Sequence, residues 1–179
     1  RDYEPYRLLI KKISEQLKRK RKMEKKIKIK KTVKCDTRTL SPGAVIAEAD
    51  ALTDTLKHRD AVIACAHYLI DLLEAQVKEH DKTKVDNIEW FTSGLNKGIN
   101  SEEFDKWYQM HVNSERHHLL QSVPEDVNLV DVIEMICDCV SAGMARTGKV
   151  FDVEIPADIL VKAVSNTAKM LIDNIEVED

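Results

Sequence analysis

One stretch of the sequence, from Val45 to Lys78, carries a helical pattern that no glycine or proline interrupts. Its apolar residues recur at intervals of three and four, which is the spacing of one face of an α-helix. These apolar positions are Leu52, Leu56, Val62, Ile63, Ala66, Leu69, Ile70, Leu73 and Val77. The segment is far longer than a β-strand, and helical spacing returns later in the chain. The sequence therefore predicts an all-α fold organised around a long helix.

A second helix is predicted to begin at Ser101, which precedes two glutamates and the apolar positions that lead to His111. Serine is a favoured N-cap because its side chain accepts a hydrogen bond from a free backbone N–H. The preceding segment, residues 86–100, contains Gly94 and Gly98. Because glycine marks turns, we expect a connection there and not a helix.

Two further helices have clear end signals. Asn128 is a suitable N-cap for a helix over residues 129–145, and Gly148 is placed to end that helix. Pro156 suits the first turn of a last helix, which is predicted to continue through Ile172.

The sequence predicts little β-structure. In residues 25–34 isoleucines and lysines nearly alternate, which is typical of a strand with one solvated face. Residues 150–155 also alternate, and they are acidic where the first segment is basic. Opposite charges on paired strands attract. We therefore expect one small two-stranded pairing between these segments, with a helix over residues 3–23 before them.

Charge is distributed unevenly along the chain. Residues 1–35 carry 15 Lys and Arg against 4 Asp and Glu, a balance of +11, and the rest carries 13 against 27, a balance of −14. Together these give the net charge of −3. We divide the chain into a basic N-terminal appendage, residues 1–43, and a helical domain, residues 44–179. The appendage either binds an anionic partner such as nucleic acid or neutralises its own acidic body.

A His-Asp pair lies in the segment Glu79-His80-Asp81-Lys82-Thr83-Lys84. Both residue types are ligands for divalent metals, and a carboxylate can bridge two ions. Lys84 follows His80 by four residues, close enough to meet an anion held on such a metal. Further candidate ligands are His58, His111, His117, His118, Glu134 and Asp138.

Glu134 and Asp138 are four residues apart on a predicted helix and therefore share one face. If that face is turned inward, two buried carboxylates need a metal or a histidine as partner; the alternative is that the face points to solvent. His117 and His118 are adjacent and would diverge by about 100° on a helix. We therefore expect one of them to bind metal and the other to meet substrate.

The ligand order, His … His-Asp … His … His-His … Asp, resembles that of the larger two-metal HD-domain proteins. Over residues 52–149 the chain looks like a family of small phage and bacterial proteins of unknown function related to HD-domain phosphohydrolases. The segments that carry this resemblance are His58-Arg59-Asp60-Ala61-Val62, the His80–Lys84 motif, Trp107–Asn113, Arg116-His117-His118, Glu134–Asp138 and Ser141-Ala142-Gly143. The family usually has serine at Thr83 and an aromatic residue at Cys139, and neither difference removes a ligand.

The resemblance implies an HD-like helical bundle with a site for one or two divalent metal ions. His58, His80, Asp81 and Asp138 would bind the first ion, and His111 with His117 or His118 the second. His58 and His80 are 22 residues apart, about 33 Å along a straight helix, which is too far for one ion. Either the helix bends or stops near residues 67–74, or His58 is not a ligand in its own protomer.

Our first functional hypothesis is a metal-dependent phosphohydrolase acting on a nucleotide or a related small phosphate. A bound ion would lower the pKa of water and polarise the phosphoryl oxygen. Lys84 and Arg116 would hold phosphate oxygens, and Glu134 would orient a ligand histidine or act as a general base.

Two other hypotheses remain. One is a binding protein on an HD-like scaffold, phage-encoded or regulatory, which uses its basic N-terminal segment on a host protein or nucleic acid. The other is an oxidative di-iron enzyme. The expected partners are thus a small phosphorylated substrate, nucleic acid or a host protein, and a second copy of the chain in a homodimer. Without an apolar membrane span, a secretory signal or a CxxC pair, we expect a cytoplasmic protein, in the host cytoplasm if it is phage-encoded.

Overall fold

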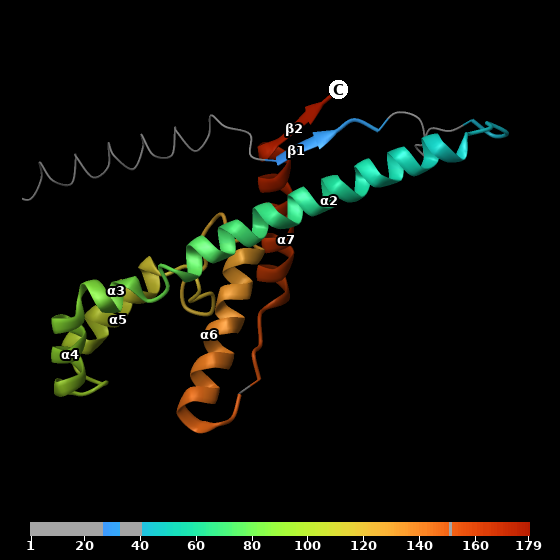
Figure 1. The fold of residues 1–179 in the computed structure, drawn as a ribbon. Coiled ribbons are helices and arrows are strands. Elements are labelled where there is room, and N and C mark those ends of the chain that lie inside the picture. The colour runs from blue at the N-terminus through green and yellow to red at the C-terminus, as the bar shows by residue number, and fades with distance from the viewer. Residues whose placement is uncertain (1–26, 33–40, 151) are drawn as a thin grey trace, which may run out of the picture. The chain divides into compact units, whose positions relative to one another are not determined.

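The computed structural model of the protein describes residues 27–32, 41–150 and 152–179, and these residues are mostly helical with one small sheet (Figure 1). This confirms the predicted fold class. The helix expected over residues 3–23 lies outside the described residues. Among the described helices, none is both long enough and apolar enough to cross a membrane. The chain divides into two units, residues 1–68 with 171–179 and residues 69–170, and each is described by itself.

The long helix α2 runs from Glu48 to Val77, close to the predicted bounds, and it begins in the first unit. It passes through residues 67–74 without interruption. The break that would bring His58 back toward His80 on a second helix is therefore not present.

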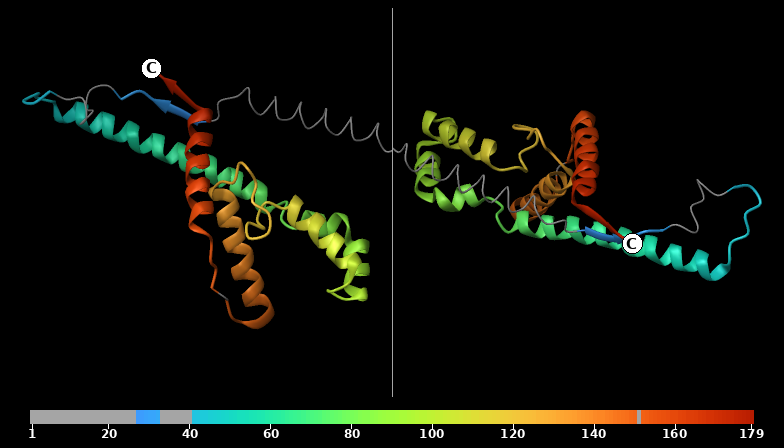
Figure 2. Two further views of the ribbon diagram at one scale, coloured as in Figure 1. Left: turned by 180° about the vertical axis from the view of Figure 1, so that it is seen from behind. Right: turned by 90° about the horizontal axis from the view of Figure 1, so that it is seen from above.

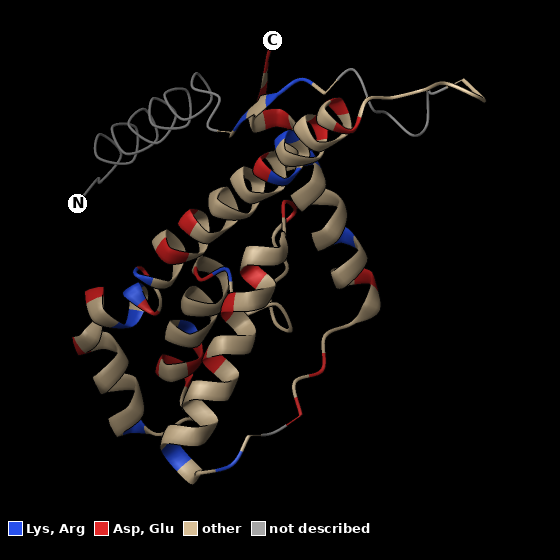
Figure 3. Cartoon of the chain, turned by 45° about the vertical axis from the view of Figure 1, so that its right-hand side comes forward, with Lys and Arg blue, Asp and Glu red and all other residues tan. Residues whose placement is uncertain are grey.

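The first unit also contains a two-stranded parallel sheet (Figure 2). Strand β1, Ile27–Lys30, pairs with strand β2, Ile175–Glu178. The ammonium group of Lys28 lies 3.0 Å from the Glu178 carboxylate. Figure 3 shows the basic residues of β1 beside the acidic residues of β2. The expectation of a basic strand paired with an acidic one is confirmed.

The predicted partner of β1 was wrong. Residue 150 and residues 152–155 form no strand. Val153 and Ile155 instead pack against the hydrophobic core of the second unit. Two acidic, alternating segments were available in the sequence, and charge complementarity alone could not distinguish between them.

Three helices follow α2 in the second unit: α3 over Lys82–Asp86, α4 over Ile88–Lys97 and α5 over Glu102–Ser114. Ser101 caps α5 as predicted, accepting a hydrogen bond from the Phe104 backbone N–H. The connection expected over residues 86–100 was wrong, because most of it is α4. A Cβ atom at Gly94 would lie only 3.1 Å from the Phe104 Cα. That glycine therefore permits close packing of α4 on α5, whereas Gly98, with φ 99°, ends α4.

Helices α6, Leu129–Thr147, and α7, Ala157–Asn174, agree with the predicted helices. Asn128 caps α6 in a capping box with Asp131, and Gly148 ends it in the left-handed conformation. The Thr167 hydroxyl on α7 accepts a hydrogen bond from the Leu129 backbone N–H at 2.9 Å. The core between these helices consists of Leu119, Val127, Val132, Met135, Ile159 and Ala163.

Candidate metal centre

The turn between α2 and α3 places Asp81 in an unusual backbone conformation. Asp81 has φ 55° and ψ 20°, and it is the only non-glycine residue with positive φ in the described part of the chain. Aspartate tolerates this left-handed region better than most residues, but the conformation still carries strain. Strained backbone of this kind is often found where a side chain must be held in one direction for function.

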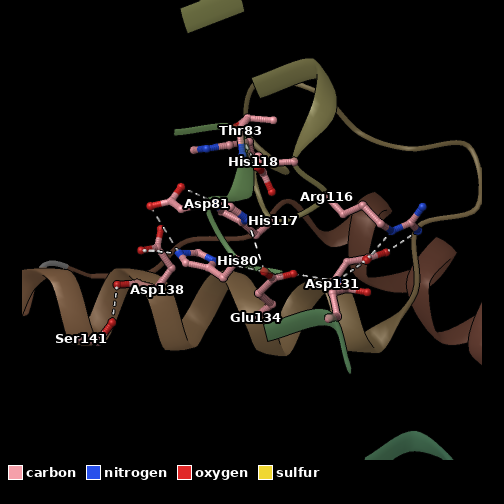
Figure 4. A network of polar contacts seen from close by, with 12 residues as sticks. His80, Asp81, Thr83, Arg116, His117, His118, Asp131, Glu134, Asp138 and Ser141 are labelled. Atoms are coloured by element: carbon pink, nitrogen blue, oxygen red, sulfur yellow. Dashed lines mark hydrogen bonds and ion pairs between the residues drawn. The ribbon is translucent and has the colours of Figure 1, made fainter. Parts of the chain in front are cut away.

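Asp81 lies with three histidines in the second unit, in a group of side chains able to hold a metal ion (Figure 4). The Asp81 Oδ1 atom is 3.5 Å from His111 Nε2 and 4.0 Å from His117 Nε2. The Nε2 atoms of His118 and His111 face each other at 2.8 Å. His111 comes from α5, and His117 and His118 follow it in the next turn. One ligand atom from each of the four residues lies within 4.8 Å of the others.

Several of these atoms are buried without a hydrogen-bond partner. They are the Oδ1 atom of Asp81 and both ring nitrogens of His117. Buried polar atoms are normally paired, because leaving one unpaired costs about 1–3 kcal/mol. In a tetrahedral site with metal–ligand distances of about 2.0–2.1 Å, neighbouring ligand atoms are about 3.3 Å apart. The distances of 2.8 to 4.0 Å between these ligand atoms are close to that spacing, and an ion there would give a partner to Asp81 Oδ1 and to one nitrogen of His117.

A second group consists of His80, His117 and Asp138. His80 Nε2 lies 3.5 Å from Asp138 Oδ1 on α6 and 3.7 Å from Asp81 Oδ2. His117 belongs to both groups, but its neutral ring has only one lone pair to give. Asp81 can serve both, since its two oxygens face different histidines.

Glu134 contacts the Nδ1 atoms of two of these histidines, His80 and His117. Its Oε1 atom is 2.9 Å from His80 Nδ1 and 3.5 Å from His117 Nδ1, and its Oε2 atom accepts a hydrogen bond from Gln76 at 2.7 Å. A carboxylate on Nδ1 keeps the proton on that nitrogen and leaves the Nε2 lone pair free for a metal. The contact with His80 agrees with the predicted orienting role of Glu134.

The arginine beside the histidine pair is tied into a separate network. Arg116 donates from Nε and from a terminal nitrogen to the two Asp131 oxygens at 2.7 and 2.8 Å. Asp131 is fully buried, and it also accepts from Gln76 and from the Asn128 backbone N–H. The other terminal nitrogen of Arg116 donates to Asp126 at 3.0 Å. The predicted phosphate contact of Arg116 stays a prediction, and these bonds already use most of its N–H donors.

Three residues that the sequence reasoning did not select support the site. Gln76 joins Glu134 to Asp131. Thr83 lies between His111 and Glu115, with its hydroxyl 2.6 Å from His111 Nδ1 and 2.7 Å from Glu115 Oε1. These polar side chains have no distinctive spacing in the sequence. Only the position of Thr83 inside the His80–Lys84 motif could have pointed to one of them.

Burial and charge set the protonation of the cluster. Burial lowers the pKa of His111 and, together with the charges of His117 and His111, lowers the pKa of His118 to about 4. Burial alone would lower the pKa of His117, but the Glu134 carboxylate outweighs it and raises that pKa. Burial alone would raise the pKa of Glu134, whereas the nearby His117 ring and the hydrogen bonds from Gln76 and His80 bring it to about 2. At neutral pH, His111 and His118 are therefore neutral and able to bind metal.

Asp81 also stays ionised. Burial would raise its pKa, but the hydrogen bond and positive charge of Lys84, with smaller contributions from His80 and His111, lower it. The Lys84 ammonium group donates to Asp81 Oδ2 at 2.6 Å. The predicted proximity of Lys84 to the His-Asp pair is thus present in the structure.

The structure brings together most of the predicted ligands: His80, Asp81, His111, His117, His118 and Asp138. His117 and His118 were expected to diverge, but both belong to the Asp81 group, so their positions allow them to share one ion. They lie in a turn after α5, where the helical divergence of about 100° does not apply. His58 is exposed on α2 in the first unit and is in neither group. Its role as a ligand stays a prediction.

A pocket of about 290 Å³ adjoins the cluster on the α6 side. Asp138 forms part of its wall, so one residue belongs to both the candidate metal group and the pocket. The other lining residues are Cys139, Ala142, Gly143, Arg146, Thr147, Asp152 and Val153. Gly143 allows the chain at Lys149 to pass close to α6, because a Cβ atom at position 143 would lie only 2.7 Å from the Lys149 carbonyl oxygen.

Comparisons with known proteins give a family but no activity. Searches of curated proteins and of solved structures found no match. Residues 47–174, which include the whole histidine and aspartate cluster, match the model of a family of unknown function, DUF5662. The chain therefore belongs to the DUF5662 family.

Proposed function

We propose that this protein is a metal-dependent phosphohydrolase that acts on a nucleotide or a related small phosphate. The observation that carries the proposal is Asp81, whose two oxygens face different sets of histidines from a strained turn. With His111, His117 and His118 on one side and His80 and Asp138 on the other, Asp81 would bridge two divalent ions. The order of these residues in the chain also supports a relationship to HD-domain phosphohydrolases.

A divalent ion in this site would supply a Lewis acid that polarises a phosphoryl oxygen and makes bound water more acidic. The hydrogen bond of Glu134 to His80 Nδ1 would keep the Nε2 atom of His80 available as a ligand, and Glu134 also lies 3.5 Å from His117 Nδ1. Lys84 bonds to the Asp81 oxygen on the His80 side. If that oxygen binds metal, the Lys84 ammonium group is left beside the site, where it can stabilise the charge developing on a phosphate.

The pocket next to Asp138 offers a place for the organic part of the substrate. Its volume is at the small end of the range for ligand pockets, which suits a nucleoside-sized group or smaller. Arg146 can meet an anionic group of the substrate, and Asp152 can accept hydrogen bonds from hydroxyl or amino groups. Ala142 and Val153 supply apolar surface.

The test combines metal analysis with an activity panel. Purified protein should contain a transition metal by mass spectrometry. It should release phosphate from at least one nucleotide in a panel with Mn²⁺, Co²⁺, Mg²⁺ or Fe²⁺. Asp81→Ala and Asp138→Ala should each lose metal and activity. His67→Ala is the control, because His67 is exposed on α2 in the first unit. Metal binding without any phosphate release would contradict the hydrolase.

A di-iron oxidative enzyme is the second candidate, because a carboxylate between histidine groups also suits iron. It would consume O₂ with Fe²⁺ and release no phosphate in the same panel. The alternative of a binding protein rests on the basic segment, residues 1–35, which is mostly outside the described residues. It stays a prediction.

A further inference from the structure

Thr83 and Glu115 connect the start of α3 to the end of α5 through a chain of hydrogen bonds that ends on His111. The Thr83 backbone N–H donates to Glu115 Oε1 at 2.8 Å, and the Thr83 hydroxyl lies 2.7 Å from the same oxygen. That hydroxyl is also 2.6 Å from His111 Nδ1. The His111 ring is 1% exposed and stacks on Trp107, with ring centroids 5.0 Å apart. Its orientation is therefore fixed on both the polar and the apolar side.

The direction of each hydrogen bond follows from the chemistry of the three groups. A carboxylate only accepts, so the Thr83 hydroxyl proton must point to Glu115. If that proton pointed to His111, the hydroxyl oxygen and the Glu115 oxygen would face each other at 2.7 Å with no proton between them. The Thr83 oxygen is thus left to accept a bond, and His111 Nδ1–H is the donor. The His111 proton is then on Nδ1, and the lone pair is on Nε2.

We propose that Glu115 and Thr83 form a relay that sets the tautomer of His111 and so presents its Nε2 lone pair to the metal position. This inference rests on the metal site proposed above, and it assigns a positioning role to two residues outside the ligand set. His111 Nε2 is 2.8 Å from His118 Nε2 and 3.5 Å from Asp81 Oδ1. These three atoms belong to the group that could hold one shared ion. The wrong tautomer would direct an N–H at that ion.

Asp81 and Thr83 act on the same ion from one short segment. Asp81 is the N-cap of α3 and Thr83 is two residues further on. The turn that directs the Asp81 carboxylate inward therefore also sets the Thr83 hydroxyl against His111. A substitution that removes only the hydroxyl would leave the Asp81 ligand in place and separate the two contributions.

The experiment compares wild type with Thr83→Val, Thr83→Ser and Glu115→Ala, all freed of metal. Long-range ¹H–¹⁵N NMR of ¹⁵N-histidine-labelled protein at neutral pH reads the His111 tautomer, and titration with Zn²⁺ gives the affinity. Wild type and Thr83→Ser should hold the proton on Nδ1. Thr83→Val should show a mixture of tautomers and bind Zn²⁺ about 10–100-fold more weakly, as other outer-sphere changes do. Glu115→Ala should lie between them.

Two results would overturn the relay. One is a Thr83→Val protein that keeps both the tautomer and the affinity of wild type. The other is a loss of affinity with an unchanged His111 tautomer, because that would indicate a general packing defect. If the wild-type protein carries the His111 proton on Nδ1 but binds no Zn²⁺, the proposed metal site fails and the relay has no metal to serve. Circular dichroism of each variant confirms that the helices are intact.

Discussion

Two clusters of buried charge lie close together in the second unit, and they differ in whether their atoms are satisfied. In the Asp131 cluster, both carboxylate oxygens accept bonds from Arg116, and Gln76 and the Asn128 backbone add two more. In the Asp81 cluster, Asp81 Oδ1 and both nitrogens of His117 have no hydrogen-bond partner. A saturated cluster can hold elements together by itself. A cluster with unpaired buried atoms lowers the stability of the fold, and a bound ligand that pairs those atoms removes this loss.

The two clusters are joined through Gln76, whose amide donates to both Asp131 and Glu134. Arg116 directly precedes His117 and His118, so the bonds of Arg116 to Asp131 also fix the turn that carries those histidines. The satisfied cluster thus positions the unsatisfied one. The comparison predicts that changes in the first affect folding, whereas changes in the second affect binding.

The largest effect is expected for Asp131→Ala. Removing one partner of a buried ion pair typically costs about 3–5 kcal/mol, and we expect the lower end here because Arg116 is 34% exposed and keeps its contact with Asp126. Here Arg116 and Gln76 both lose an acceptor. Urea unfolding of the metal-free protein should show a loss of this size. Asp71→Ala, an exposed position on α2, should change the free energy of unfolding by less than about 0.5 kcal/mol. A small effect at Asp131 would erase the distinction between the clusters.

A smaller effect is expected from acid acting on Glu134. Its pKa is lowered from 4.5 to about 2 in the folded protein, and its side chain is 4% exposed. Its contribution to stability is fully present above pH 4.5 and is lost as the pH falls toward 2, because the unfolded chain takes up the proton first. The loss should be about 2–3 kcal/mol. The free energy of unfolding, measured with urea at a series of pH values, should lose this pH-dependent contribution in Glu134→Gln. An unchanged pH dependence would mean that the histidines do not hold Glu134 ionised.

The smallest effect is expected for Lys84→Ala. An ammonium group cannot ligate a metal, so Zn²⁺ affinity should stay within about threefold of wild type, since Lys84 only shares the Asp81 carboxylate. Binding of inorganic phosphate to the metal-loaded protein should weaken by about 3–10-fold, as expected for one partly exposed charge contact. Lys82→Ala is the matched control, because Lys82 is in the same turn but pairs with the exposed Glu79. Equal phosphate binding by all three proteins would remove Lys84 from the site.

The parts of the fold that could be predicted have local causes. The bounds of α2, α5, α6 and α7 follow from apolar spacing and from caps such as Ser101, Asn128 and Gly148. Helix α4 was missed because Gly94 is a packing residue against Phe104, and a packing glycine cannot be told from a turn glycine in the sequence alone. The partner of β1 was missed because strand pairing depends on competition among distant segments.

In the candidate site, too, the residue types could be predicted from the sequence, whereas the contacts between distant residues could not. Most residues of the two candidate groups were predicted because histidine and aspartate are recognisable as metal-ligand types. Their grouping was less accurate. That His117 and His118 share one group depends on the turn after α5, and the contacts of Arg116 depend on Asp131, 15 residues away. The roles of Thr83 and Glu115 depend on a contact between residues 32 positions apart. Such contacts leave no pattern in the sequence.

The most direct test of the account is calorimetric titration of a divalent metal into metal-free wild type and into Asp81→Asn. Asparagine tolerates the left-handed conformation of Asp81 and keeps its shape, but it lacks the negative charge. Wild type should bind one or two ions, and the variant should bind more than about 100-fold more weakly, because a direct ligand matters more than the outer contacts. Both proteins should have similar metal-free stability. If Asp81→Asn binds metal as tightly as wild type, or wild type binds none, the unpaired atoms around Asp81 are not a metal site.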